Sequence, residues 1–287
     1  PMETLKQIRG RIKAAKSIQQ ITRAMKLVAA ARFKRATERA LAARPYSEKL
    51  KDVVSSLSGA GELPAHPLLE RNDSDNYALI LVTAERGLCG SYNTNLIRRA
   101  AQFLRETPGV AKVIGVGKKG ALFFGKRGYE VVYQHTLPSA GASFDDAKAV
   151  AKVTQELFES GEVSKVYLCY AKFYSAIRQV PQVVQLLPIE PPETEEKSGA
   201  NLGYIFEPTA DTLVGTLLPR YFLTLLWQAL LEATASEFAA RMTAMTNATE
   251  NAGKMIQNLT LKANRERQAT ITKEILEVVS GAEALKS

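Results

Sequence analysis

The sequence is poor in the residue types that build metal sites, disulfide frameworks and many catalytic centres. Its 287 residues include two cysteines, Cys89 and Cys169, and two histidines, His66 and His135. None of the four has a second ligand at the spacing of a zinc site, and no nucleophile elbow occurs, so we expect no metal ion, no cofactor and no catalytic constellation. Two cysteines in this pattern are typical of free thiols in a reducing compartment.

Long hydrophobic runs are also missing. No stretch of about 18 uncharged apolar residues occurs, which is the length that a membrane-spanning helix needs. Residues 217–231 come closest, but Pro219 and Arg220 lie near the start of this run and Glu232 follows it, so we expect a buried helix. The N-terminus lacks the apolar segment of a signal peptide, which favours an intracellular protein.

Acidic residues are scarce at the N-terminal end. The first fifty residues contain thirteen basic and three acidic side chains, an excess of ten, whereas the whole chain has an excess of nine. A basic helix is commonly a solvated surface, and otherwise it indicates an acidic partner such as nucleic acid, anionic lipid or protein. Few aromatic side chains accompany these bases, so stacking on single-stranded nucleic acid is not expected.

Both ends of the chain have the pattern of long helices. Apolar and small residues recur at intervals of three and four over residues 3–57 and again from about residue 209 almost to Lys286, as in a coiled-coil seam. We expect a kink or local break at Pro45. Helices this far apart in the sequence bury their apolar stripes by pairing with each other, which predicts an antiparallel coiled coil.

The two helices differ in length. At 1.5 Å per residue, the C-terminal helix would be about 110 Å long and the N-terminal one about 80 Å. In an antiparallel pair the C-terminal helix would therefore extend beyond its partner by several turns. This overhang contains Ile271, Ile275, Val278 and Val279, and we expect another chain to cover them.

The middle of the chain has the pattern of an α/β domain. Short apolar runs alternate with helical segments, which predicts a mainly parallel, three-layer, Rossmann-like sheet. The expected strands are 77–83, 112–117, 129–134, 165–173 and 182–187, and the expected helices are 91–107, 118–127 and 144–160. The predicted division is a coiled-coil helix at 1–58, a linker at 59–76, the α/β domain at 77–190, a linker or foot at 191–208, and a coiled-coil helix at 209–287.

Two glycine-rich segments come near to nucleotide-binding motifs. "GVGKKG" (115–120) follows a strand, but no acidic residue stands about twenty positions on to hold a ribose. "GALFFGKR" (120–127) ends in Arg127 where a P-loop has a hydroxyl. Asp145 and Asp146 are interpreted as caps of a helix start. Two alternative hypotheses therefore have little support. A nucleotide-binding enzyme with helical arms is indicated by one incomplete motif, and a nucleic-acid clamp is indicated by the basic helix alone.

Three segments resemble a known family. "ITRAMKLVAAARFKRA" (21–36), "TAERGLCGSYNTN" (83–95) and the C-terminal segment 240–285 closely resemble the gamma subunit of F-type ATP synthases, the rotating central stalk. The resemblance covers the whole chain in order. The cysteine-containing insertion of thiol-regulated photosynthetic forms is absent, so the resemblance is to the ordinary bacterial type.

The resemblance implies a mechanical function. The coiled coil would lie on the axis of a hexamer of alpha and beta subunits, with the overhang in an apolar sleeve. The globular domain would contact the epsilon subunit and the ring of c subunits, at the cytoplasmic face of the bacterial membrane and without inserting into lipid. Rotation driven by proton flow would change the nucleotide affinities of the beta subunits, and this chain would bind no nucleotide.

The resemblance also implies contact residues along the stalk. Met25, with Arg241 opposite, matches the place where the stalk meets the beta subunits. Arg267, Gln268 and Thr272 match positions that contact a loop of the hexamer further along. The alternative for each is structural, with Met25 filling the seam and Arg241 on a solvated helix face.

Further contact residues are implied outside the stalk. Arg86, Gly87 and Cys89 match a loop that faces an acidic lever of the beta subunit. Tyr204 and Glu207 match the foot that meets polar loops of the c ring. Electrostatic complementarity would then pair the basic first helix with acidic surface of beta.

Overall fold

The computed structural model describes residues 4–59, 64–190 and 210–284. Within them the helices are α1 (Leu5–Gly59), α2 (Tyr92–Glu106), α3 (Lys118–Gly125), α4 (Phe144–Glu159) and α5 (Ala210–Ala284). The strands are β1 (Asn76–Val82), β2 (Val110–Val116), β3 (Glu130–His135), β4 (Lys165–Ser175) and β5 (Arg178–Leu187). The α/β class and the two long terminal helices are confirmed.

The chain forms two compact units, and both long helices contribute to each. One unit takes the chain up to Val28 together with the chain from Met242 onward, and the other consists of Ala29–Arg241. We call them the stalk unit and the sheet unit. The five-segment division made from the sequence follows secondary structure rather than packing, and it stays a prediction.

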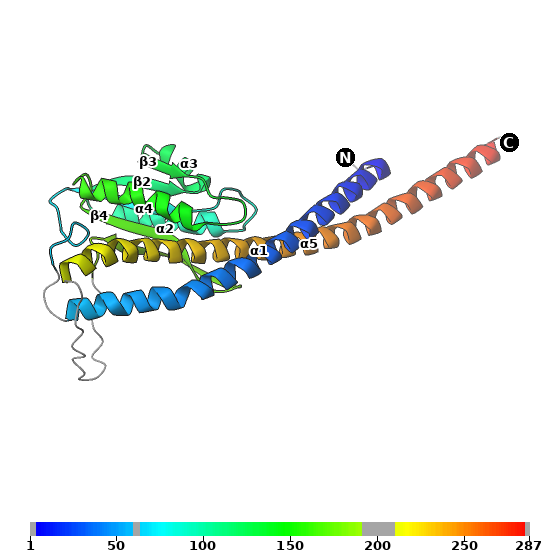
Figure 1. The fold of residues 1–287 in the computed structure, drawn as a ribbon. Helices are drawn as coiled ribbons and strands as arrows, with labels where there is room; N and C mark the ends of the chain where they lie inside the picture. Colours follow the sequence, from blue (N-terminus) through cyan, green and yellow to red (C-terminus); the bar gives the residue numbers. More distant parts are fainter. Residues whose placement is uncertain (1–3, 60–63, 191–209, 285–287) are drawn as a thin grey trace. The chain divides into compact units, whose positions relative to one another are not determined.

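The sheet has the order β3-β2-β1-β4-β5, and Figure 1 labels β3, β2 and β4 of this sheet. β1 pairs in parallel with β2 and β4, and β2 pairs in parallel with β3. β5 runs antiparallel to β4, because a connection this short can only reverse the chain. The mainly parallel sheet is confirmed. The last strand begins at Arg178, earlier than predicted from the sequence.

After Asn76, β1 is buried on both faces and consists of apolar and aromatic residues from Tyr77 to Val82. Tyr77, Leu79 and Leu81 pack against α2 and α3. The alternate residues, among them Ile80 and Val82, pack against α4 and the first part of α5. Side chains of a strand alternate between the two faces of a sheet, so both faces here need apolar residues. The predicted three layers are confirmed.

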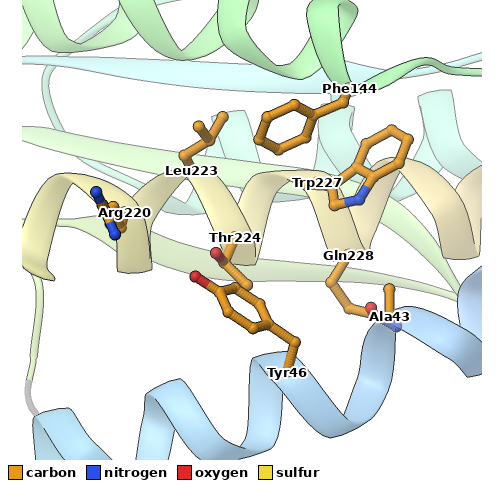
Figure 2. A pocket seen from close by; sticks show the side chains of 8 residues that line it. All are labelled: Ala43, Tyr46, Phe144, Arg220, Leu223, Thr224, Trp227 and Gln228. Atoms are coloured by element: carbon orange, nitrogen blue, oxygen red, sulfur yellow. The ribbon is translucent and has the colours of Figure 1, made fainter.

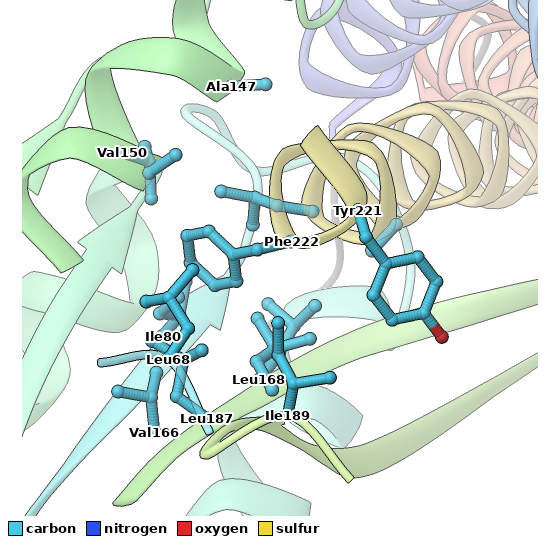
Figure 3. Packing of buried hydrophobic residues seen from close by; sticks show 14 of the residues in the cluster. Leu68, Ile80, Ala147, Val150, Val166, Leu168, Leu187, Ile189, Tyr221 and Phe222 are labelled. Carbon is cyan, nitrogen blue, oxygen red and sulfur yellow. The ribbon is translucent and has the colours of Figure 1, made fainter. Parts of the chain in front are cut away.

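The first part of α5 covers one face of the sheet together with α4. Phe222 is completely buried, and Figure 3 shows its ring directed from α5 towards Ile80, Leu68 and Val150. The prediction that residues 217–231 form a buried helix is confirmed, but the sequence did not indicate that the sheet buries it. This stretch makes α5, from Thr212, long and apolar enough to cross a membrane by length and composition alone, with 44% of the apolar window buried. Packing onto the sheet accounts for that apolar composition.

α1 continues through Pro45, so a local break is wrong, and the alternative of a kink stays a prediction. Proline lacks the N–H that would bond to the carbonyl of Leu41, which weakens one turn. Buried residues on both sides, Ala40 before it and Leu50 and Val54 after it, hold the flanking turns in place. Packing of the neighbouring turns therefore offsets the lost hydrogen bond.

In the stalk unit the two helices pair in antiparallel directions. The Thr249 hydroxyl donates to Thr22 Oγ1 at 2.8 Å, and Gly253 faces Gln19, whose Nε2 would lie 3.0 Å from an added Cβ. Between these two contacts the residue number increases along α5 and decreases along α1, so the two helices run in opposite directions. Buried residues on the two helices follow the predicted seam, and they are Ile8, Ala15, Thr22, Met245, Ala252 and Leu259.

A capping box holds the start of α4 to the edge strand β3. Ser143 caps the helix by accepting from the Asp146 N–H, and the Asp146 carboxylate accepts from the Ser143 N–H and hydroxyl. Its other oxygen lies 2.7 Å from Nε2 of His135 on β3. Burial by itself raises the pKa of Asp146, but the hydrogen bonds from Ser143 and His135 outweigh it, so the pKa is lower than its ordinary value of 3.8. Asp146 is a cap, as predicted.

Asp146→Asn is expected to lower the free energy of unfolding by about 1 kcal/mol at pH 7, a typical value for a helix cap. A carboxyl whose folded pKa is depressed stabilises the protein above its unfolded pKa, and this contribution is lost as the pH falls through the folded value. Urea unfolding at pH 7 and pH 3 measures both effects. The wild type should lose more stability over this interval than the variant, and the exposed neighbour Asp145→Asn should behave like the wild type. An equal acid response in Asp146→Asn would contradict this prediction.

Candidate functional site

The candidate site is a loop that follows β1 at the carboxyl end of the sheet and is held by side chains of α2 and α5. β1 lies between β2 and β4, where the direction of the chain connections reverses, and in open α/β sheets this is the usual place for a ligand. The loop contains Arg86, Gly87 and Cys89, which the family resemblance implies as contacts. The contact roles of these three residues stay predictions, and the geometry of the loop says which of their side chains reach solvent.

The glycine segment after β2 closes this end of the sheet. A Cβ at Gly117 would lie 2.0 Å from the Thr83 carbonyl oxygen, and one at Gly120 would lie 2.7 Å from Leu81 Cδ2. The N–H of Gly120 donates to Thr83 Oγ1 at 2.9 Å, and that of Lys119 donates to the Ala84 carbonyl. Close packing explains these glycines, and two of the first amides of α3 already have acceptors within the chain.

Asn93 and Cys89 fix the loop from the side of α2. Asn93 Oδ1 accepts from the Ala84 N–H at 2.9 Å, and its Nδ2 lies 3.3 Å from Cys89 Sγ. Cys89 is 1% exposed. Burial raises the pKa of its thiol, although the nearby charge of Arg241 acts in the opposite direction. The cysteine therefore holds the loop from inside, whereas Arg86 is exposed.

Arg241 on α5 holds the loop from the other side. Its Nη1 donates to the Gly87 carbonyl at 2.6 Å, and its Nη2 forms an ion pair with Glu237 at 2.5 Å. Burial raises the pKa of Glu237, and the guanidinium partly offsets this. Arg241 is thus neither on a solvated face nor free, and it positions the loop. Glu237 was missed from the sequence, where it is one glutamate in a long helix.

The loop presents Leu88 to solvent in a strained conformation. Leu88 has φ 63°, the left-handed region, and is 62% exposed. A leucine in this region costs about 1–2 kcal/mol, and here the bonds to Gly87 and Asn93 maintain it. Sequence patterns gave no signal for Leu88, because the left-handed conformation depends on the anchored neighbours.

Leu88→Gly is expected to raise the free energy of unfolding by about 1 kcal/mol relative to Leu88→Ala. Both variants lose the same exposed side chain, but only glycine relieves the left-handed strain. Urea unfolding of the two variants gives the difference. If alanine is as stable as glycine at this position, the strain argument is wrong.

The other predicted contacts lie in the stalk unit or outside the described residues. Arg267, Gln268 and Thr272 are exposed on the last part of α5, and the Thr272 hydroxyl donates to the Gln268 carbonyl at 2.9 Å. Tyr204 and Glu207 lie outside the described residues. Met25, which is partly buried, belongs to the stalk unit, whereas Arg241 belongs to the sheet unit, so their proximity stays a prediction.

The last part of α5 is exposed on every side. All residues from 267 to 284 are exposed, and Figure 1 shows this red end of α5 extending past the N-terminal end of α1. Five large apolar side chains lie here, and they are Ile271, Ile275, Leu276, Val278 and Val279. Four of them, at i, i+4, i+7 and i+8, form one stripe. The overhang predicted from the sequence is confirmed.

Comparison with known protein sequences finds relatives along nearly the whole chain. The ATP synthase family model matches residues 4–285. The ATP synthase gamma chain of Pelotomaculum thermopropionicum is 47% identical and aligns over 99% of this chain and 100% of its own length. That of Brevibacillus brevis is 43% identical over 98% of both chains.

Two solved structures share the fold. A chain in the mitochondrial ATP synthase of Euglena gracilis, solved with OSCP, F1 and the c-ring, has a TM-score of 0.71 at 22% identity, covering 98% of this chain and 94% of that one. A chain in the central stalk and c-ring structure of the Tetrahymena thermophila mitochondrial enzyme has a TM-score of 0.58 at 25% identity, covering 79% and 99%. With curated relatives of this identity aligned from end to end, this chain belongs to the ATP synthase gamma chain family.

Proposed function

We propose that this chain is the rotating shaft of an F-type ATP synthase and carries no catalytic site of its own. It would couple proton flow through a ring of c subunits to conformational change and ATP synthesis in the beta subunits. One observation supports this most directly, namely the exposed apolar stripe on the last part of α5. Such a stripe on a helix without an intrachain partner needs cover from another protein.

A role without nucleotide binding is supported by the carboxyl end of the sheet. The first N–H groups of a helix bind phosphate when they are free. In α3 the N–H groups of Lys119 and Gly120 donate to Ala84 and Thr83 instead, and Gly117 before the helix is packed against the Thr83 carbonyl. This end of the sheet positions the loop at Leu88 rather than a nucleotide.

The proposed partners follow from the surfaces described above. The stripe from Ile271 to Val279, with Arg267, Gln268 and Thr272, would lie in the sleeve of the alpha and beta hexamer. The loop with Arg86 and Leu88 would meet beta, held in shape by Gly87, Cys89 and Arg241. The sheet unit would contact epsilon and the c ring, with Tyr204 and Glu207 at the ring. With these contacts the chain would lie at the cytoplasmic face of the membrane, as a peripheral subunit that does not insert into lipid.

Co-purification tests the assembly. The chain, expressed with the alpha and beta subunits of the same organism, should be isolated as a single copy with the alpha/beta hexamer. Failure to associate under conditions in which the hexamer forms would refute the proposal. Hydrolysis of ATP by the isolated chain would refute its non-catalytic part.

Met25→Lys is expected to reduce ATP-driven proton pumping while ATP hydrolysis and assembly continue. A new charge on the stalk would meet the beta subunits, disturbing coupling more than folding. Acidification of inverted membrane vesicles, compared with their rate of ATP hydrolysis, measures the coupling ratio. Met25→Leu, which keeps an apolar side chain, should retain the wild-type ratio. Normal pumping in Met25→Lys would count against a coupling contact at Met25.

A further inference from the structure

The sheet unit contains a cavity that the proposed coupling mechanism does not use. It has a volume of about 510 Å³ and lies between α1, the start of α4 and α5. Figure 2 shows the side chain of Tyr46 on α1 directed towards Thr224 on α5, and the ring of Phe144 on α4 beside that of Trp227. This volume is in the range of small-molecule sites, roughly 300–1,000 Å³.

The walls of the cavity are aromatic and partly exposed. Tyr46 is 59% exposed and Phe144 is 43% exposed. The rings of Phe144 and Trp227 meet edge to face with centroids 5.7 Å apart. Helices rarely leave aromatic rings uncovered on facing surfaces, since each ring gains from burial. A flat or branched apolar body between Tyr46 and Trp227 would cover them.

The Gln228 side chain lies beside these rings, and its amide is only partly hydrogen-bonded. Gln228 lines the cavity, and its Nε2 donates to the Ala40 carbonyl at 3.4 Å and to Glu232 Oε1 at 3.3 Å. These two bonds fix the amide. Gln228 Oε1 is buried and accepts no hydrogen bond from the described part of the chain. An unpaired buried acceptor costs about 1–3 kcal/mol, but this oxygen is closed off from the cavity, so an occupant does not reach it.

The charge at the edge of the cavity is positive. Arg220 lines the cavity and is exposed, and it forms no ion pair with the residues that the structure describes. Arg39 lies over the Trp227 ring, 5.6 Å from its centroid. A guanidinium recognises carboxylate, sulfonate or phosphate oxygens with paired hydrogen bonds. The edge therefore favours an anionic group next to the apolar body.

We propose that this cavity binds a small amphipathic organic anion, with an aromatic or branched body and an acidic group. The body would lie between Tyr46, Phe144 and Trp227, and the acid would pair with Arg220. Because α1 and α5 both line the cavity, an occupant stabilises their packing within the sheet unit. The cavity would act as an effector site within the sheet unit, and it lies outside the loop at Leu88 and the stripe from Ile271 to Val279.

The sole tryptophan of the chain makes this proposal measurable. Trp227 lines the cavity, so the aromatic anion 8-anilino-1-naphthalenesulfonate, which carries both a secondary amine and a sulfonate, should quench its emission in the full-length protein. We expect saturable quenching at one site, with a dissociation constant on the order of 10 µM, as for a fragment-sized ligand.

Variants separate this site from general surface binding. Arg220→Gln should weaken the sulfonate about tenfold, and Ala43→Leu, which fills the cavity from α1, should weaken it at least as much. N-phenyl-1-naphthylamine, the same body without the sulfonate, should bind wild type and Arg220→Gln equally. Arg178→Gln, which removes an exposed arginine beside the Tyr174 ring away from the cavity, should leave binding unchanged.

Two outcomes overturn the proposal. One is the absence of saturable quenching of Trp227 up to millimolar probe. The other is equal affinity in wild type, Arg220→Gln and Ala43→Leu, which would locate the probe elsewhere. Arg220 is exposed, so its variant tests the site even if Ala43→Leu fails to fold. Neither result affects the rotor proposal, which depends on association with the hexamer.

Discussion

Replacing Phe222 by alanine is expected to lower the free energy of unfolding of the sheet unit by about 4 kcal/mol. Large-to-small substitutions in a packed core lose the transfer free energy of the removed atoms and leave a cavity, and phenylalanine to alanine typically costs about 3–5 kcal/mol. Phe222 is completely buried and contacts residues of the sheet, of α4 and of the segment before β1. All of these elements lose packing together.

Urea unfolding followed by the emission of Trp227, which belongs to the same unit, measures this loss. Phe222→Leu serves as the matched control, because leucine keeps most of the apolar volume and should cost about 1 kcal/mol. A loss of 1 kcal/mol or less in Phe222→Ala would mean that α5 is not held on the sheet by this side chain.

Deletion of residues 272–287 is expected to weaken association with the alpha/beta hexamer by at least about tenfold, while the sheet unit stays folded. Complete burial of a valine, leucine or isoleucine side chain stabilises by about 1.5–3 kcal/mol, and part of this is offset by the entropy of association. The deletion removes Ile275, Leu276, Val278 and Val279, which are all exposed. Stability of the chain alone therefore changes little.

Dissociation of the purified complex, followed by size exclusion at decreasing concentration, gives the affinity. Ile275→Ser combined with Val278→Ser keeps the length of α5 and should reproduce most of the loss. Lys273→Ala combined with Glu277→Ala removes an exposed ion pair of the same segment, worth little in solvent, and should have no effect. Wild-type affinity in the truncated protein would refute the sleeve contact.

The positions of the elements were predictable because their signals are local. The heptad seam from Ile8 to Thr22 and the apolar run of β1 follow from side-chain periodicity alone. Helix lengths follow from the same periodicity, so the overhang at Ile271 was predictable as a difference of lengths. The incomplete motif at Gly115–Gly120 was rejected for its missing acidic residue, and the packed glycines are consistent with that interpretation.

The candidate site could not be derived from local patterns. Arg241 was expected at an interface or on a solvated face, but it reaches back to the Gly87 carbonyl across more than 150 positions of sequence. The left-handed Leu88 and the buried Cys89 depend on that same anchor and on Asn93. Nothing in a short window of sequence distinguishes an arginine that positions a loop from one that faces solvent.

The sequence by itself determined which segments are helices and strands, how long the two terminal helices are, and that one of them is too long for the other to cover. Only the tertiary structure decided that the first part of α5 covers the sheet, that Pro45 leaves α1 continuous, and that Tyr46, Phe144 and Trp227 line one cavity. Secondary structure depends on neighbours a few positions apart, whose pattern is visible in the sequence. The choice of packing partner depends on the shapes and free energies of surfaces that only the folded chain brings together.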